Sequence, residues 1–146
     1  MTRRNLVEES ITRAVIAAFF AVYNKLGFGF LEHLYVMALE RELLKRGHRV
    51  AREFLARVCY DAGELGFHRL DMVVDDTVIV EVKSTFHLHK SAQRQVHNYL
   101  RATNLEVGLL LHFGPEPQFF RLYVPNRNES VPDAHTKAQE VLTDQN

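Results

Sequence analysis

The sequence predicts an α/β domain in which a central mixed β-sheet is flanked by α-helices. Three observations lead to this class. Residues 6–26 and 31–46 carry apolar side chains at helical spacing, and residues 48–83 contain three runs with strand character. A third helical pattern at 91–103 precedes two further strand patterns at 106–113 and 118–124. This order of elements is typical of a sheet whose faces are covered by helices.

Length and composition fit one globular domain. The chain has 146 residues, 47% of them hydrophobic and 25% charged, and Lys plus Arg equal Asp plus Glu at 18 each, so the net charge at pH 7 is zero. A domain that holds nucleic acid by charge alone is usually basic. Nucleic-acid binding would therefore need a local basic strip or a partner. We expect the domain to span residues 1–125 and a polar tail, with at most a short helix at 134–142, to span 126–146.

The cysteine content and the first apolar run bear on the cellular compartment. A single cysteine, Cys59, excludes an internal disulfide framework and suits a reducing cytoplasm, where we expect the protein. We expect this cysteine to be half-buried on a strand. The apolar run at 14–23 follows Arg3 and Arg4 but is too short to span a bilayer. We interpret it as part of a core helix and expect no contact with a membrane.

The two helices before the first strand are mainly structural. In the first, the predicted inward side chains are Ile11, Val15, Ala18, Phe19, Val22 and Leu26. Two glycines at 27 and 29 break the pattern, and a glycine at 47 ends the second helix. The predicted inward side chains of the second helix are Leu31, Leu34, Tyr35, Ala38, Leu39 and Leu43. Glu32 in its first turn is either an acid favoured by the helix dipole or a functional residue.

Residues 69–83 organise the rest of the chain. Two β-branched runs, 69–74 and 78–83, are joined by a short acidic connection and predict a hairpin, yet they carry Asp71, Glu81 and Lys83. Buried charges cost several kcal/mol unless they are paired or hold a metal. Two carboxylates suit Mg²⁺, which prefers oxygen ligands and keeps water or phosphate in its remaining positions. Lys83 could then orient a nucleophile or stabilise charge that develops at phosphorus.

The hairpin must satisfy one geometric condition. A two-residue turn at Asp75 and Asp76 would pair Asp71 with Val80 and send Asp71 and Glu81 to opposite faces. We therefore predict a connection of three or five residues, or a bulge, that places the two acids opposite each other.

Arg69 and the third helix supply further candidates. Arg69 has the same parity as Asp71 in the strand, so it either meets a phosphate in the same cleft or forms an ion pair with Asp71 or Glu81. Gln95 and Tyr99 are four residues apart and share one side of the helix. Their structural alternative is a rim residue and a core aromatic. The strand at 106–113 is apolar throughout, as expected of a strand covered on both faces, and 118–124 is expected at an edge.

Three motifs resemble known nucleases. Asp71 followed by Glu81-Val82-Lys83 on adjoining strands resembles the core of the PD-(D/E)xK nuclease superfamily. Residues 29–35, Gly-Phe-Leu-Glu-His-Leu-Tyr, match the motif of the GxxExxY family, which is usually grouped with that superfamily. Residues 95–99, Gln-Val-His-Asn-Tyr, match the Gln-x-x-x-Tyr motif of nucleases that resemble the RecB and lambda exonuclease group.

The resemblance implies a restriction-endonuclease-like core and a function. It assigns Asp71 and Glu81 as metal ligands, Lys83 as the catalytic lysine and Glu32 as a further ligand or water-holder. Gln95 and Tyr99 would position substrate, although residues 91–94, Ser-Ala-Gln-Arg, lack the acidic or histidine-bearing stretch expected before the glutamine.

The function so implied is a Mg²⁺-dependent nuclease, with Mn²⁺ as a substitute, that hydrolyses DNA rather than RNA and acts at DNA ends. The alternatives are a non-catalytic nuclease-like module for nucleic-acid binding or protein assembly, and a structural ion-pair cluster. A homo-oligomer could build the groove that a neutral monomer lacks.

Overall fold

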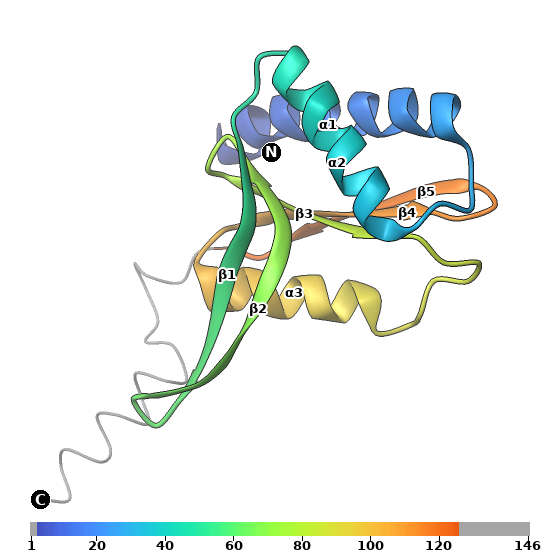
Figure 1. Ribbon diagram of the computed structural model, residues 1–146. Coiled ribbons are helices and arrows are strands. Elements are labelled where there is room, and N and C mark those ends of the chain that lie inside the picture. The colour runs from blue at the N-terminus through green and yellow to red at the C-terminus, as the bar shows by residue number, and fades with distance from the viewer. Residues whose placement is uncertain (1–2, 126–146) are drawn as a thin grey trace, which may run out of the picture.

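A five-stranded mixed sheet in the order β1-β2-β3-β4-β5 forms the centre of the structure (Figure 1). This computed structural model describes residues 3–125, and their side chains from residue 8 onward. Strands β3 and β4 are parallel, and the other neighbours are antiparallel. The strands are β1 (Val50–Tyr60), β2 (Gly63–Val74), β3 (Val78–Lys83), β4 (Val107–Phe113) and β5 (Pro117–Tyr123). The predicted α/β class is therefore confirmed, and β5 lies at an edge as expected.

Helices cover both faces of the sheet (Figure 1). Helices α1 (Arg3–Leu26) and α2 (Glu32–Lys45) pack on one face, where Phe19, Tyr35 and Leu39 are fully buried against side chains of β3 and β4. Helix α3 (Ala92–Thr103) connects β3 to β4 and packs on the other face. All residues of β4 are buried, as its continuous apolar sequence predicts.

Glycine is required at two positions. Gly47 follows the end of α2 with a φ of 89°, a backbone conformation that residues with a side chain rarely adopt. It ends the helix as predicted. Gly108 lets α3 approach β4 closely, because a Cβ there would lie 2.8 Å from Cγ1 of Val96. The absence of a side chain at Gly108 therefore sets how closely α3 packs on β4.

Four predicted burial states are wrong. Leu26 is 38% exposed because it is the last residue of α1, where the helix leaves the core. Leu31 is 69% exposed because it is the extended residue before α2, which begins at Glu32. Leu34 is 40% exposed because the buried stripe of α2 is Tyr35, Val36, Leu39 and Leu43, and Leu34 lies beside this stripe. Cys59 is exposed, not half-buried, because it lies near the outer end of the β1–β2 hairpin, which extends beyond the other strands (Figure 1).

In the β1–β2 hairpin, the side chains on either side of Glu53 and Asp71 point to different faces of the sheet than regular alternation predicts. Glu53 has a φ of 54° and no pairing partner in β2, whereas its neighbours Arg52 and Phe54 pair with Met72 and Leu70. On the side of Asp71 nearer the centre of the sheet, Met72 packs under α1 and α2. On the side nearer the tip of the hairpin, Leu70 packs with α3. Regular alternation would put both residues on one face. The outer part of the hairpin is therefore turned toward α3.

Some expectations concern residues that the structure does not describe. The polar tail at 126–146 and its short helix at 134–142 lie outside the described residues. In residues 3–125, no helix is long and apolar enough to cross a membrane.

Candidate active site

The turn between β2 and β3 brings Asp71 opposite Glu81. Val74 pairs with Val78, so the connection consists of the three residues 75–77, and the Thr77 amide donates to the Val74 carbonyl over 3.1 Å. The same register, continued past Met72 and Val80, reaches Asp71 and Glu81. The predicted three-residue connection is therefore confirmed.

The two carboxylates occupy the gap where regular pairing between β2 and β3 ends. The backbone amide of Asp71 donates to Oε1 of Glu81 over 2.9 Å, and the amide of Val82 donates to Oδ2 of Asp71 over 2.7 Å. Each acid thus satisfies a backbone N–H of the opposite strand, which holds both side chains in place. Oδ1 of Asp71 and Oε2 of Glu81 have no part in these two bonds. We call Asp71 and Glu81 the carboxylate pair.

Burial of the carboxylate pair makes its negative charge unfavourable. Glu81 is only 4% exposed. Burial, followed by the charge of Asp71, raises the pKa of Glu81 to about 8. Burial also raises the pKa of Asp71, against the opposing effects of the Val82 amide and Lys83. Two acids that resist ionisation side by side provide a strong electrostatic preference for a cation between them.

Lys83 and Glu32 approach this pair from two different elements. Lys83 lies two residues beyond Glu81 on β3, and its charge lowers the pKa values of Glu32, Asp71 and Glu81. Glu32 lies at the start of α2, on the surface. Partial loss of solvent around its carboxyl group, and then the charge of Asp71, raise the pKa of Glu32. Lys83 and a backbone hydrogen bond from Ser84 lower it by a smaller amount. Glu32, Asp71, Glu81 and Lys83 therefore belong to one electrostatic cluster.

His68 is a site residue that the sequence reasoning missed. Its ring stacks on Tyr99 of α3 with centroids 4.4 Å apart and planes 3° apart, and its Nε2 lies 3.7 Å from Oε2 of Glu81. Burial, then Lys83, lowers the pKa of His68, whereas burial, then Glu81, raises the pKa of Tyr99. Simple alternation from Asp71 assigns His68 to the opposite face. Only the change of face at Asp71 brings it to α3.

Gln95 lies where two hollows meet on α3. A cavity of about 390 Å³ is lined by Lys83, Gln95 and the connection between β3 and α3. A groove of about 640 Å³ between α3 and β1 is lined by Gln95, Tyr99 and Arg57, among others. Gln95 and Tyr99 therefore share one side of the helix, as predicted, and Gln95 shares a cavity with Lys83.

Arg69 lies apart from the carboxylate pair. Its guanidinium is 3.8 Å from Oε2 of Glu53 and 5.7 Å from the centroid of the Phe67 ring. The alternative role of Arg69, an ion pair with Asp71 or Glu81, is therefore wrong, because the change of face between Arg69 and Asp71 breaks the parity on which it was based. The arginine whose charge acts on Asp71 is Arg52, which the sequence reasoning did not single out.

The carboxylate pair fits a hard divalent cation. Each acid has one oxygen held by a backbone amide and another outside that bond, and the pair is largely buried. Within residues 3–125, no three Asp, Glu, His or Cys side chains converge closely enough to form a ready-made metal cage. Two protein carboxylates, with the remaining positions taken by water and substrate, match the requirements of Mg²⁺.

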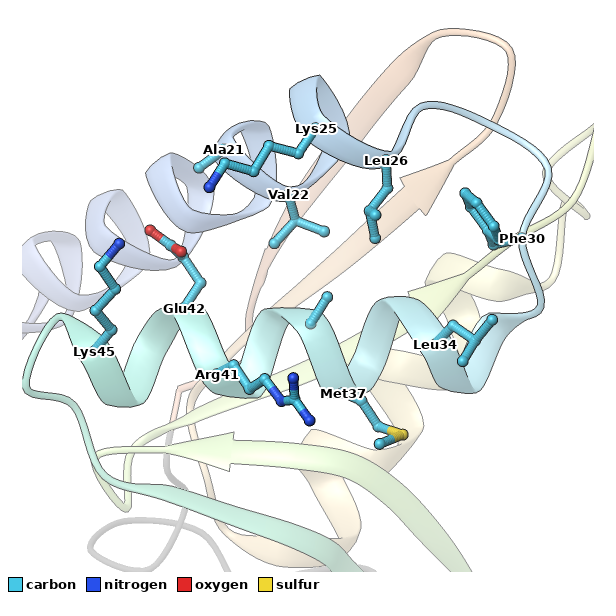
Figure 2. Close-up of a pocket in the computed structure, with 11 residues that line it drawn as sticks. Ala21, Val22, Lys25, Leu26, Phe30, Leu34, Met37, Arg41, Glu42 and Lys45 are labelled. Carbon is cyan, nitrogen blue, oxygen red and sulfur yellow. The ribbon is translucent and has the colours of Figure 1, made fainter.

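A separate apolar groove of about 590 Å³ lies between α1 and α2 (Figure 2). Leu26, Leu34 and Met37 contribute apolar lining, and Lys25, Arg41 and Lys45 contribute positive charge. None of the four charged residues of the electrostatic cluster lines it. Its position on the α1–α2 side, away from α3, separates it from the cavity that Lys83 and Gln95 share.

Comparisons with protein families and with solved structures both give matches. A family model described as PD-(D/E)XK nuclease superfamily matches residues 9–122. The crystal structure of SSO0001 is similar with a TM-score of 0.50 and 18% sequence identity, over 97% of this chain and 69% of that one. An alkaline exonuclease from Laribacter hongkongensis gives a TM-score of 0.41 and 12% identity, over 77% of this chain and 66% of its own. No curated protein gives a significant match.

Proposed function

Because the chain belongs to the PD-(D/E)XK nuclease superfamily, we propose that it is a metal-dependent nuclease that hydrolyses DNA phosphodiester bonds. Its fold is the α/β restriction-endonuclease-like core, a mixed sheet between helices. One observation carries the proposal: the carboxylates of Asp71 and Glu81 each accept a hydrogen bond from a backbone amide of the opposite strand, and the charge of Lys83 acts on both acids. A plain structural ion pair would not need two acids that resist ionisation.

In the proposed mechanism, Asp71 and Glu81 would hold Mg²⁺, with Mn²⁺ as a substitute. The ion when bound would polarise a phosphoryl oxygen and make its water more acidic. Nucleases of this superfamily generally use divalent metal ions. Lys83 would place its ammonium group against the charge that develops on the phosphoryl oxygens during attack by water. The water oxygen bonds to phosphorus and gives up one proton, the bond to the departing sugar oxygen breaks, and that oxygen takes up one proton, so the products are a phosphate monoester and a free hydroxyl.

The remaining residues have proposed roles around this centre. Glu32 would complete the metal environment or hold the attacking water, which its electrostatic contact with Asp71 and Lys83 supports. Gln95 would orient the substrate from the cavity that it shares with Lys83, and Tyr99 would do so while stacked on His68. Arg69 remains a predicted phosphate contact, now at the periphery, because its guanidinium faces Glu53.

Three finer assignments are also proposals. The Gly-Phe-Leu-Glu-His-Leu-Tyr motif at 29–35 supports membership of the GxxExxY family within the superfamily. The Gln-x-x-x-Tyr motif at 95–99 supports action at DNA ends. The single cysteine, exposed on the hairpin, is consistent with the expected cytoplasmic location.

A cleavage assay tests the proposal. Purified protein is incubated with end-labelled single-stranded DNA, duplex DNA and RNA of one sequence, with Mg²⁺, Mn²⁺ or EDTA. We expect metal-dependent cleavage of DNA that falls by about 10²-fold or more in Lys83→Met, because one electrostatic contact to the transition state is worth about this much. Covalently closed circular DNA should resist if the enzyme needs an end.

The control is Lys45→Met, which removes a lysine from the α1–α2 groove and should leave the rate unchanged. Cleavage that persists in Lys83→Met would mean that another site or a contaminant is responsible. Absence of cleavage on every nucleic acid with either metal would reject the nuclease assignment.

A further inference from the structure

Three exposed aromatic rings lie beside the proposed active site. Phe28 and Phe30 belong to the connection between α1 and α2, and Phe86 belongs to the connection between β3 and α3. Their exposed fractions are 43%, 47% and 64%. The rings of Phe28 and Phe86 meet edge to face with centroids 6.2 Å apart, although their positions in the sequence are far apart. We call these three rings the aromatic platform.

Short covalent links join the platform to the charged cluster. Phe86 follows Lys83 by three residues, so their Cα atoms are at most about 11 Å apart. Phe30 precedes Glu32 by two residues. The Ser84 hydroxyl donates to the Phe30 carbonyl over 2.6 Å, so the two connections are also tied to each other next to the site. The platform is therefore adjacent in the chain to the place where Lys83 would meet a phosphate.

Hydrogen bonds from buried residues keep both connections in place. The Tyr35 hydroxyl donates to the Gly27 carbonyl and accepts from the Phe30 amide, over 2.5 and 3.2 Å. On the other side, Nε2 of His112, which is 3% exposed, lies 2.8 Å from the Thr85 carbonyl. These anchors hold large apolar rings in water rather than letting them fold inward. Contiguous exposed apolar surface of this kind marks a binding site.

We propose that the aromatic platform stacks unpaired bases next to the phosphate that is cut, so that the preferred substrate is a single-stranded stretch of nucleic acid. This inference rests on the proposed nuclease function. Aromatic rings stack on bases of any sequence. The faces of unpaired bases are free for this contact, whereas in a duplex they are already stacked on neighbouring bases. Stacking would also add to the affinity for nucleic acid, because a chain with zero net charge gains little affinity from attraction to the phosphates.

A protein partner is the weaker fit for the platform. The neighbouring α1–α2 groove, with Phe30 at its end in Figure 2, has the aliphatic lining typical of a protein contact. Phe28 and Phe86 do not line that groove. Phe86 instead lies in the same connection as Ser84, which directly follows Lys83 and whose hydroxyl binds the Phe30 carbonyl. Continuity with the phosphate site therefore favours nucleic acid as the occupant.

A tryptophan reporter tests the inference directly. The chain contains no tryptophan, so Phe86→Trp introduces a single fluorescent ring at the platform. The variant is titrated in EDTA, where no hydrolysis is expected, with a 12-nucleotide oligo-dT, an abasic 12-mer with the same phosphates, and a 12-base-pair blunt duplex. We expect quenching by oligo-dT, and about tenfold weaker binding of the abasic strand.

Fluorescence anisotropy of a labelled oligo-dT provides the second measurement. The double variant Phe28→Ala/Phe86→Ala should bind about tenfold more weakly than wild type. Leu65→Ala, which removes an exposed apolar side chain from the outer hairpin, should bind as wild type does. Both altered rings are exposed, so we expect an unchanged unfolding midpoint.

The outcomes separate this inference from the proposed function. Base-dependent binding without cleavage under any condition would uphold the platform and reject the nuclease. Cleavage with equal affinity for oligo-dT and the abasic strand would uphold the nuclease and overturn the platform. Binding of the duplex as tight as that of oligo-dT would overturn it as well. So would a wild-type dimer that the double variant converts to a monomer with unchanged affinity for oligo-dT.

Discussion

The raised pKa of Glu81 predicts a stability that falls with pH in the metal-free protein. The carboxyl titrates near pH 8 in the folded chain, against an ordinary value of 4.5. Between these values the folded protein holds a proton that the unfolded chain has released, so folding takes up a proton and the free energy of unfolding decreases as the pH rises. The contribution is fully present below about pH 4.5 and is lost above about pH 8.

The magnitude follows from linkage. Each pH unit inside this window changes stability by roughly 1.4 kcal/mol for one fully shifted group. Between pH 6 and pH 8 wild type should therefore lose about 2–3 kcal/mol relative to Glu81→Gln, which cannot ionise. Because Glu81 is almost fully buried, solvent screening reduces this figure little. Above pH 8 the difference between the two proteins should become constant.

Urea unfolding followed by circular dichroism, in EDTA at pH 6, 7, 8 and 9, measures this difference. Glu42→Gln is the matched control, because it removes an acid that is paired with Arg46 on the helix surface. Saturating Mn²⁺ should stabilise wild type more at pH 8 than at pH 6, since the cation competes with the proton. If wild type and Glu81→Gln have parallel pH profiles in EDTA, the two acids do not share a buried field, and the argument for a cation site fails.

Three further changes test separate parts of the structure. Asp71→Asn should weaken Mn²⁺ binding at least about tenfold in isothermal titration, while Asp76→Asn in the exposed turn should not; equal affinities would place the cation elsewhere. Gly108→Ala should cost about 1–3 kcal/mol in urea unfolding, because its Cβ meets α3, whereas Gly66→Ala has open space; equal stabilities would contradict this close packing. Tyr35→Phe should cost about 1–3 kcal/mol by leaving two backbone groups of the α1–α2 connection without their partner; an unchanged unfolding midpoint would show that water replaces it.

The sequence was sufficient for the fold class and for the geometry of the carboxylate pair. Helical spacing identified α1, α2 and α3, and an uninterrupted apolar run identified β4, because both patterns depend on burial alone. The three-residue connection followed from a chemical requirement: Asp71 and Glu81 could serve one purpose only if they shared a face. The structure meets that requirement with Val74 paired to Val78.

The surroundings of the pair were harder to predict. Glu53 adopts a positive φ that its side chain does not favour, and at this point the side chains of the hairpin change the face of the sheet to which they point. Strict alternation consequently placed Arg69 in the cleft and His68 outside it, which is the reverse of what the structure has. Leu34 was assigned to the core because periodicity defines a stripe on the helix but does not say how wide the sheet beneath it is.

The tight hairpin that carries the carboxylate pair has a consequence for the order of folding. Loop closure between β2 and β3 involves three residues, whereas β3 can pair with β4 only after the whole crossover through α3 is in place. The two acids can therefore meet early, before Tyr99 and the α3 face cover them. A divalent ion would then neutralise their repulsion in a partly folded chain, and stopped-flow refolding should be faster with Mn²⁺ than with EDTA. Equal refolding rates would mean that the acids come together only at the end.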